Sequence, residues 1–218
     1  MRSSNYFRLG LSYLAVNVIL NLAAISSVTL SPGDVASGGS ATGKVTIDEV
    51  ARTGAIVTLS SVPTAVATVP SSTIIGAKSS TASFPITTHA AGCALISAHL
   101  GTTTTKSALL YVTPPAPDPN LKLTLSKSVV IAGGPVTATL LVSVNSATPA
   151  ATVQVTGSNE HVTVPSSVNL NLIEGGIGTA TFTIGTTSVN APTCAVITVT
   201  HNGVHSQALL KINPAFFG

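Results

Sequence analysis

The two cysteines are the residues of this sequence with the clearest chemical potential. Cys93 and Cys194 are its only thiols, and each precedes a run of alternating apolar and polar residues. The chain around them repeats, as shown below, so a bond between them requires two tandem units to fold back face to face, with Cα atoms within about 7 Å. In an exported protein, two unpaired thiols indicate pairing with another chain or contact with a partner subunit. The alternative is that each is a small, partly buried packing residue.

The other residues that could carry chemistry do not form a catalytic or metal-binding group. His201 and His205 are four apart, but the Asn-Gly between them marks a tight hairpin, and metal pairing at this spacing requires a helix. Asp48 and Glu49 would face opposite sides of a strand. The sequence contains neither an Asp-x-Asp run for calcium nor the G-x-S-x-G pattern of a serine hydrolase. We therefore predict no catalytic, metal or cofactor site, and a protein that is not an enzyme.

Charge and aromatic content exclude one further class of function and disfavour another. Only 7% of residues are charged, against about 25% in an average soluble domain. Arg2 and Arg8 lie in the N-terminal segment, and the remaining seven basic residues against six acidic ones leave a net charge of +1. The basic residues are scattered and tryptophan is absent, so a nucleic-acid partner is excluded. A carbohydrate-binding module is also disfavoured, because such sites usually recruit several aromatic residues.

The N-terminal segment predicts export. Residues 1–8 carry two arginines and no acid, residues 9–25 are uncharged and mostly apolar, and Ala24-Ile25-Ser26 resembles a cleavage site. This is the order of a secretory signal peptide. The same stretch also fits an uncleaved membrane-anchor helix, because about 17–25 residues cross a bilayer. The membrane-facing residues of that anchor would be Leu9, Leu11, Leu14, Val16, Val18, Ile19, Leu20 and Leu22. Both alternatives place the rest of the chain on the outer side.

The remainder of the chain contains two copies of one pattern. Six landmarks recur in one order at offsets of 95 to 101 residues, which indicates a duplication. The paired landmarks are residues 28–32 and 123–127, the Gly-Gly pairs 38–39 and 133–134, 67–72 and 162–167, 81–86 and 179–184, 92–96 and 193–197, and 107–110 and 207–210. Short alternating runs separated by Gly, Pro, Ser or Asn predict antiparallel β-sandwiches. On this alternation Ala94, Ile96 and Ala98 face inward, and the thiols of Cys93 and Cys194 point outward or lie at the entrance of their strands.

A proline-rich stretch separates the copies. Residues 114–119 hold four prolines, which favour a stiff, extended spacer. The predicted organisation is a signal peptide or membrane-anchor helix over 1–26, a first domain over 27–113, a linker over 114–119 and a second domain over 120–218. The fold class is thus all-β, with two tandem sandwiches behind a hydrophobic N-terminal helix.

Part of the sequence resembles a known family. The run from Leu30 to Thr113, with its Gly38-Gly39 pair and Val69-Pro70-Ser71-Ser72, resembles a bacterial immunoglobulin-like repeat. The second copy matches more loosely, and together they cover most of the chain. The resemblance implies a seven-strand sandwich in an exported or cell-surface protein, with a spacer, scaffold or adhesive role and no catalytic motif.

Two functions remain open at this point. The first is a structural accessory subunit, held at the membrane by its N-terminal helix, that braces a larger assembly such as a bioenergetic or photosynthetic complex. The second is a secreted surface filament or adhesin subunit that assembles with copies of itself through sheet edges. The expected partners are therefore other protein subunits, further copies and the membrane. The partner-contact residues would be Cys93, Cys194, Phe216 and Phe217.

Overall fold

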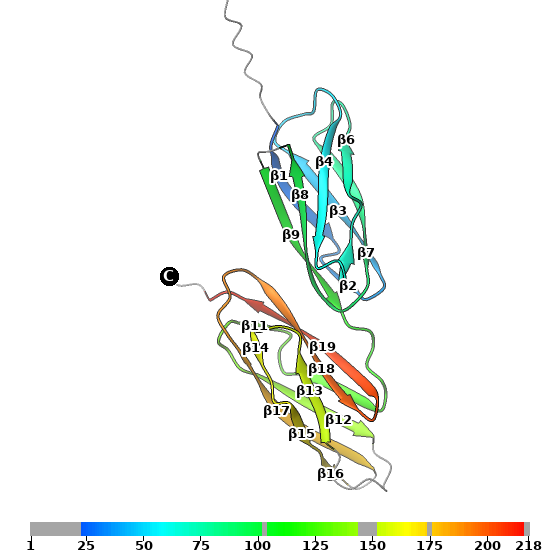
Figure 1. The fold of residues 1–218 in the computed structure, drawn as a ribbon, viewed down its shortest axis with the longest axis vertical. Coiled ribbons are helices and arrows are strands. Elements are labelled where there is room, and N and C mark those ends of the chain that lie inside the picture. The colour runs from blue at the N-terminus through cyan, green and yellow to red at the C-terminus, as the bar shows by residue number, and fades with distance from the viewer. Residues whose placement is uncertain (1–22, 102–103, 144–151, 174–175, 216–218) are drawn as a thin grey trace, which may run out of the picture.

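In the part of the chain that the structure describes, every helix or strand element is a β-strand. The computed structural model describes residues 23–101, 104–143, 152–173 and 176–215. The first nine strands are β1 (Ile25–Ser31), β2 (Asp34–Ala36), β3 (Ser40–Ile47), β4 (Ala55–Val62), β5 (Ala67–Thr68), β6 (Ser72–Ile75), β7 (Thr81–Thr88), β8 (Gly92–Leu100) and β9 (Thr104–Thr113). They form the upper sandwich of Figure 1, which we call the first sandwich.

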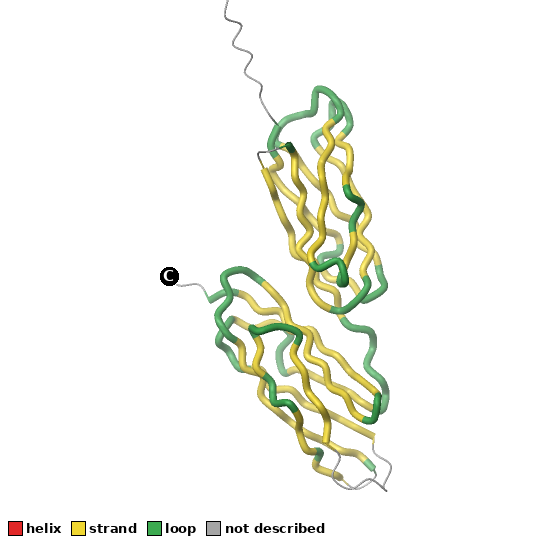
Figure 2. Tube along the Cα trace, viewed as in Figure 1, coloured by secondary structure: helices red, strands yellow, loops and turns green. Residues whose placement is uncertain are grey.

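Ten further strands form the second, lower sandwich. They are β10 (Leu121–Leu125), β11 (Val129–Ile131), β12 (Val136–Ser143), β13 (Thr152–Gly157), β14 (Val162–Thr163), β15 (Ser167–Asn169), β16 (Asn171–Ile173), β17 (Ile177–Thr186), β18 (Thr193–His201) and β19 (Val204–Asn213). Strands and connecting loops are distinguished in Figure 2.

Each sandwich has an immunoglobulin-like strand order. In the first, one sheet runs β1-β3-β7-β5 and the other β2-β9-β8-β4-β6. The central orders match the A-B-E and G-F-C sheets of an immunoglobulin domain. The second sandwich repeats this arrangement with β10-β12-β17-β14 and β11-β19-β18-β13-β15. The duplication predicted from the sequence is therefore visible in the strand order, although the implied number of seven strands is exceeded by short edge strands.

One difference between the copies, among the residues that the structure describes, lies at β16. The offset between equivalent residues increases from 95 at the valine-proline landmark to 98 at Thr81 and Thr179. These three extra residues allow the chain to form β16, which pairs with β17 and has no counterpart in the first sandwich. From the sequence, the change in offset indicated only a longer loop, because three extra residues are too few to show the alternating pattern of a strand.

The alternation of side chains builds a separate core in each sandwich. Ala94, Ile96 and Ala98 on β8 are fully buried, which confirms the predicted inward face of this strand. One buried cluster draws only on residues of the first sandwich and another only on residues of the second. Valine and isoleucine dominate both clusters, because β-branched side chains pack well on a pleated, half-buried surface.

Gly43 is required by the packing of the first core. It lies opposite Phe84 on the neighbouring strand, and a Cβ at this position would overlap the ring of Phe84. We expect Gly43→Ala to lower the free energy of unfolding by about 1–3 kcal/mol, because a well-packed core must shift to admit the methyl group. Chemical denaturation measures this loss. Thr42→Ala, on the exposed side of the same strand, is the control, and an equal loss in both variants would contradict the prediction.

Residues 1–22 of the predicted N-terminal helix, including the eight anchor residues from Leu9 to Leu22, lie outside the described residues. The prediction is wrong for its last residues, because Ile25 and Ser26 begin strand β1 and Ile25 is buried in the first core. The part that the structure describes contains no helix. Within those residues, no helical segment has the length and apolar character that a membrane span needs.

Candidate functional site

A disulfide joins the two sandwiches at their junction. Cys93 at the start of β8 is bonded to Cys194 at the start of β18, with a Cα–Cα distance of 6.0 Å, which is within the usual range for a disulfide. The sequence left open pairing with another chain, contact with a partner subunit, or simple packing. In this structure the two sulfurs are bonded to each other, so neither thiol is available to a partner.

The bond forms because the sandwiches meet by equivalent ends. Cys93 and Cys194 hold the same position in the repeat, 101 residues apart. In two tandem domains of the same orientation, such positions lie a domain length apart. Here the second sandwich is inverted, so that β8 and β18 both begin at the junction and run away from it in opposite directions (Figure 1). The sandwiches lie one above the other and meet at these ends, so the bond forms without the face-to-face fold-back that was expected from the sequence.

An apolar contact surrounds the disulfide. Val196 and Leu209 are cross-strand neighbours on the outer face of the second sandwich, and they are only 6% and 8% exposed. Outward-facing aliphatic residues reach such burial because Ala91, Cys93 and Tyr111 of the first sandwich pack against this cluster. The junction is thus a small hydrophobic interface with a covalent bond inside it.

An ion pair closes one side of the junction. The Nζ of Lys211 on β19 donates to Oδ1 of Asp34 on β2, and it lies 4.2 Å from the centroid of the Tyr111 ring. Lys211 is mostly buried and Asp34 is half-exposed. A cation over an aromatic face is attracted by the ring quadrupole. Lys211 therefore holds two strands of the first sandwich, β2 and β9, against the second.

The same neighbourhood changes the acidity of Tyr111. Partial burial raises the pKa of its phenol above the ordinary value of 10.0, and the nearby negative charge of Asp34 raises it further. Both effects disfavour the phenolate. The neutral phenol therefore stabilises the folded junction fully below about pH 10, and this contribution is lost as the pH rises through the higher folded pKa.

We expect Asp34→Asn to lower the pKa of Tyr111 toward 10 without reaching it, because burial is the larger cause and remains. The measurement is a tyrosinate absorbance titration, with the signal of Tyr111 taken as the difference from the Tyr111→Phe protein. Asp48→Asn, on a carboxylate that accepts from the backbone of Ala24, should leave the titration unchanged. An unchanged titration in Asp34→Asn would contradict the assignment.

The loop after β13 supports the start of β18. The side chain of Asn159 donates to the carbonyl of Cys194 at 2.7 Å, and the hydroxyl of Ser158 accepts from the backbone N–H of Val196 at 2.9 Å. The backbone N–H of Ser158 also donates to the carbonyl of Val196 at 3.0 Å. These bonds fix the strand from which Cys194 and Val196 project.

The histidines do not converge on a site. Asn202 and Gly203 both have positive φ, which confirms the predicted Asn-Gly hairpin turn. His201 contacts the Asn202 amide next to it, while His205 is the second residue of β19. Among the described residues there is no group of three or more His, Cys, Asp or Glu side chains that could hold a metal ion.

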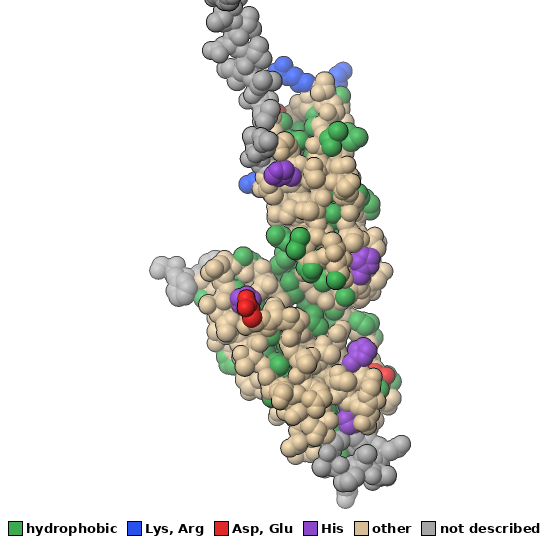
Figure 3. Space-filling view, viewed as in Figure 1, with side chains coloured by type: hydrophobic (Ala, Val, Ile, Leu, Met, Phe, Trp, Pro, Cys, Tyr) green, Lys and Arg blue, Asp and Glu red, His purple; other side chains and the backbone are tan. Residues whose placement is uncertain are grey.

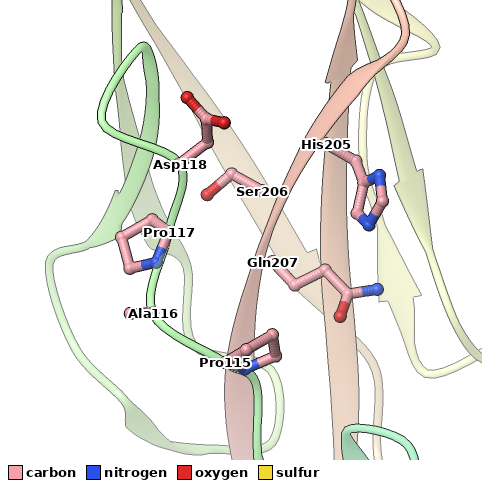
Figure 4. Close-up of a pocket in the computed structure, with 7 residues that line it drawn as sticks. All are labelled: Pro115, Ala116, Pro117, Asp118, His205, Ser206 and Gln207. Carbon is pink, nitrogen blue, oxygen red and sulfur yellow. The ribbon is translucent and has the colours of Figure 1, made fainter.

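A hollow lies between the linker and β19. It has a volume of about 230 Å³ and is lined by residues 115–118 and 205–207. Figure 4 shows the side chain of Ser206 directed toward the linker, whereas His205 and Gln207 project to the other side of the strand. Gln207 instead donates to Thr198 at 3.2 Å. The polar groups therefore do not converge on a ligand position.

The fold is similar to those of bacterial surface proteins. Domains 5–6 of the S-layer protein SbsC are 15% identical, with 89% of this chain and all of that chain covered and a TM-score of 0.33. The Escherichia coli adhesin FdeC is 20% identical, with 88% and 64% covered and a TM-score of 0.39. The Yersinia pseudotuberculosis adhesin InvE is 15% identical, with 85% and 58% covered and a TM-score of 0.34.

These solved chains are an S-layer protein and two bacterial adhesins, and the likeness concerns the fold alone. This chain spans 64% of the FdeC chain and 58% of the InvE chain, less than two thirds of each. No protein-family model matches the sequence, and a search of curated proteins finds no match.

Several junction residues were not identified from the sequence. Asp34, Tyr111, Val196, Leu209 and Lys211 carry most of the contact beside the disulfide. The alternation of side chains along the last strand of each copy could have indicated three of them. Tyr111 and Lys211 are the cross-strand partners of the two cysteines, and Leu209 lies two residues before Lys211 on the same face of its strand. The other predicted contact residues, Phe216 and Phe217, lie outside the described part of the chain.

Proposed function

We propose that this chain is an exported, non-enzymatic surface protein. Two immunoglobulin-like domains, locked together by Cys93–Cys194, act in it as a rigid spacer or presenting unit of a surface filament or adhesin. The observation that carries the proposal is the covalent junction, because it fixes the angle between two sandwiches whose non-covalent contact is small. A fixed angle is useful to a structural element.

The compartment follows from the same bond. Disulfides persist in oxidising surroundings, such as the periplasm or the cell surface, and are rare in the cytosol. An N-terminal segment with the order of a secretory signal supports the same location. We therefore place the protein on the periplasmic or extracellular side of the membrane, attached to it if residues 1–26 are retained.

We also propose boundaries for the two domains and the linker. Residues 27–113 and 120–218 would be independent domains, and residues 114–119 would be the linker between them. Separate buried clusters support this division. Phe216 and Phe217 remain candidates for contact with a protein partner. The alternative of an accessory subunit in a bioenergetic or photosynthetic complex has no supporting feature among the described residues, and we do not propose it.

The experiment is thiol labelling on intact cells that express the protein, followed by intact-mass measurement. A membrane-impermeant maleimide should label neither cysteine before reduction and both afterwards. The mass then also reports whether residues 1–26 are present, which separates an anchored protein from a secreted one. Labelling without reduction, or recovery of the protein from the cytosol alone, would contradict the proposal.

A further inference from the structure

The first sandwich carries an exposed apolar patch next to the junction. Val62 is 66% exposed and Leu95 is 45% exposed, and they are cross-strand neighbours on β4 and β8. Leu109 on β9 lies on the other side of Leu95 and is half-buried. We call these three residues the outer patch. It continues directly into the interface, because Leu95 is two residues from Cys93 on the same face of β8.

The repeat shows what this patch corresponds to in the second sandwich. Leu95 is equivalent to Val196, and Leu109 to Leu209. The two pairs occupy the same cross-strand register, Leu95 with Leu109 and Val196 with Leu209. In the second sandwich this pair is covered by another immunoglobulin-like sandwich. The equivalent surface in the first sandwich is left open.

The surroundings of the outer patch are suited to burial. The outward side chains of β4, β6, β8 and β9 above the junction are aliphatic, hydroxyl-bearing or histidine, and none is Asp, Glu, Lys or Arg. They are Ile56, Thr58, Ser60, Val62, Ser72, Ile74, Leu95, Ser97, His99, Thr105, Ser107 and Leu109. Figure 3 shows apolar side chains gathered where the upper sandwich approaches the lower one. Charge is depleted in the same way at the cores of protein interfaces.

Polar groups on this face are partly paired within the chain. The hydroxyls of Ser97 and Ser107 hydrogen-bond to each other at 2.8 Å, and His99 is hydrogen-bonded to Thr105. Groups that already have a partner lose less when water is removed than unpaired ones. Burying the face therefore leaves few polar groups without hydrogen bonds.

We propose that the outer patch is a self-association surface through which two copies of this chain pair, outer face to outer face, about a two-fold axis. The second sandwich of the same chain cannot cover the patch, because its own Val196 and Leu209 are already buried and the disulfide holds it at Cys93. A second copy presents an identical apolar and uncharged face, and an isologous contact needs only one self-complementary patch. This proposal does not depend on the surface function, because association is a property of the purified protein.

The test is sedimentation of the purified, disulfide-bonded full-length protein as exported, over a range of concentrations. We expect a monomer–dimer equilibrium that Leu95→Asp weakens at least about tenfold, since two carboxylates would meet near the axis. Val62→Asp, at a more exposed position, should also weaken the dimer. It serves as a second test in case Leu95→Asp fails to fold. Circular dichroism and thermal unfolding confirm that each variant is folded.

The matched control is Leu172→Asp on β16, an edge residue of the second sandwich with 50% exposure. It should dimerise like the unmodified protein. A protein that is monomeric up to about 1 mM, or a dimer unaffected by both Leu95→Asp and Val62→Asp, would overturn the proposal. A dimer lost only in Leu172→Asp would also overturn it and assign the contact to the β16 edge.

Discussion

Replacing Cys93 with serine is expected to lower the free energy of unfolding by about 2–5 kcal/mol. The bond joins residues 101 apart in the sequence, and closing so long a loop removes much of the conformational freedom of the unfolded chain. The same change frees the junction, where contact then depends on a small apolar cluster and on Lys211 with Asp34. We therefore expect a second effect, a broader distribution of angles between the two sandwiches.

Denaturant unfolding with and without reductant measures the first effect, and small-angle X-ray scattering measures the second. The reduced unmodified protein should behave like Cys93→Ser, and reductant should not change the variant further. Cys194→Ser is the reciprocal variant and should give the same loss. Equal unfolding midpoints for the oxidised protein and both variants would show that the bond adds no stability.

Truncating a core leucine is expected to destabilise only the sandwich that contains it. Leu110 and Leu210 are both fully buried, and each lies opposite an alanine on the neighbouring strand, Ala94 and Ala195 respectively. Replacing either with alanine should cost about 2–5 kcal/mol, because the methyl groups are lost and a cavity remains. Since the two cores share no residue, the loss should stay in one half of the reduced protein.

Hydrogen exchange followed by mass spectrometry tests this prediction half by half. With the disulfide reduced, Leu110→Ala should raise exchange in residues 27–113 and leave 120–218 unchanged, and Leu210→Ala should do the reverse. These two variants are controls for each other, because the substitution and the local environment are the same. An equal rise in both halves would show one cooperative unit and would contradict the proposed domain division.

The alternation of residues predicted the strands and their inward faces because that information is local. Side chains alternate across a strand with a period of two, so Ala94, Ile96 and Ala98 could be assigned to the core without knowing which strands were their neighbours. The duplication was equally readable, since the landmarks recur in order. The hairpin at Asn202-Gly203 followed from the need for positive φ at both positions.

The junction could not be predicted in the same way. The alternation placed Cys93 and Cys194 on outward faces but said nothing about what covers those faces. Whether equivalent ends meet depends on contacts among Asp34, Tyr111 and Lys211, which come from opposite parts of the chain. The three-residue insertion before Thr179 likewise gave no sign that it would add β16 to a sheet.

By itself the sequence therefore determined an all-β chain with two copies of one strand pattern and outward-facing thiols. Only the tertiary structure decided that these thiols bond to each other and that one apolar surface is covered while its equivalent is open. The physical reason is that strand formation depends on neighbouring residues, whereas the placement of two sandwiches depends on a few side chains far apart in the sequence.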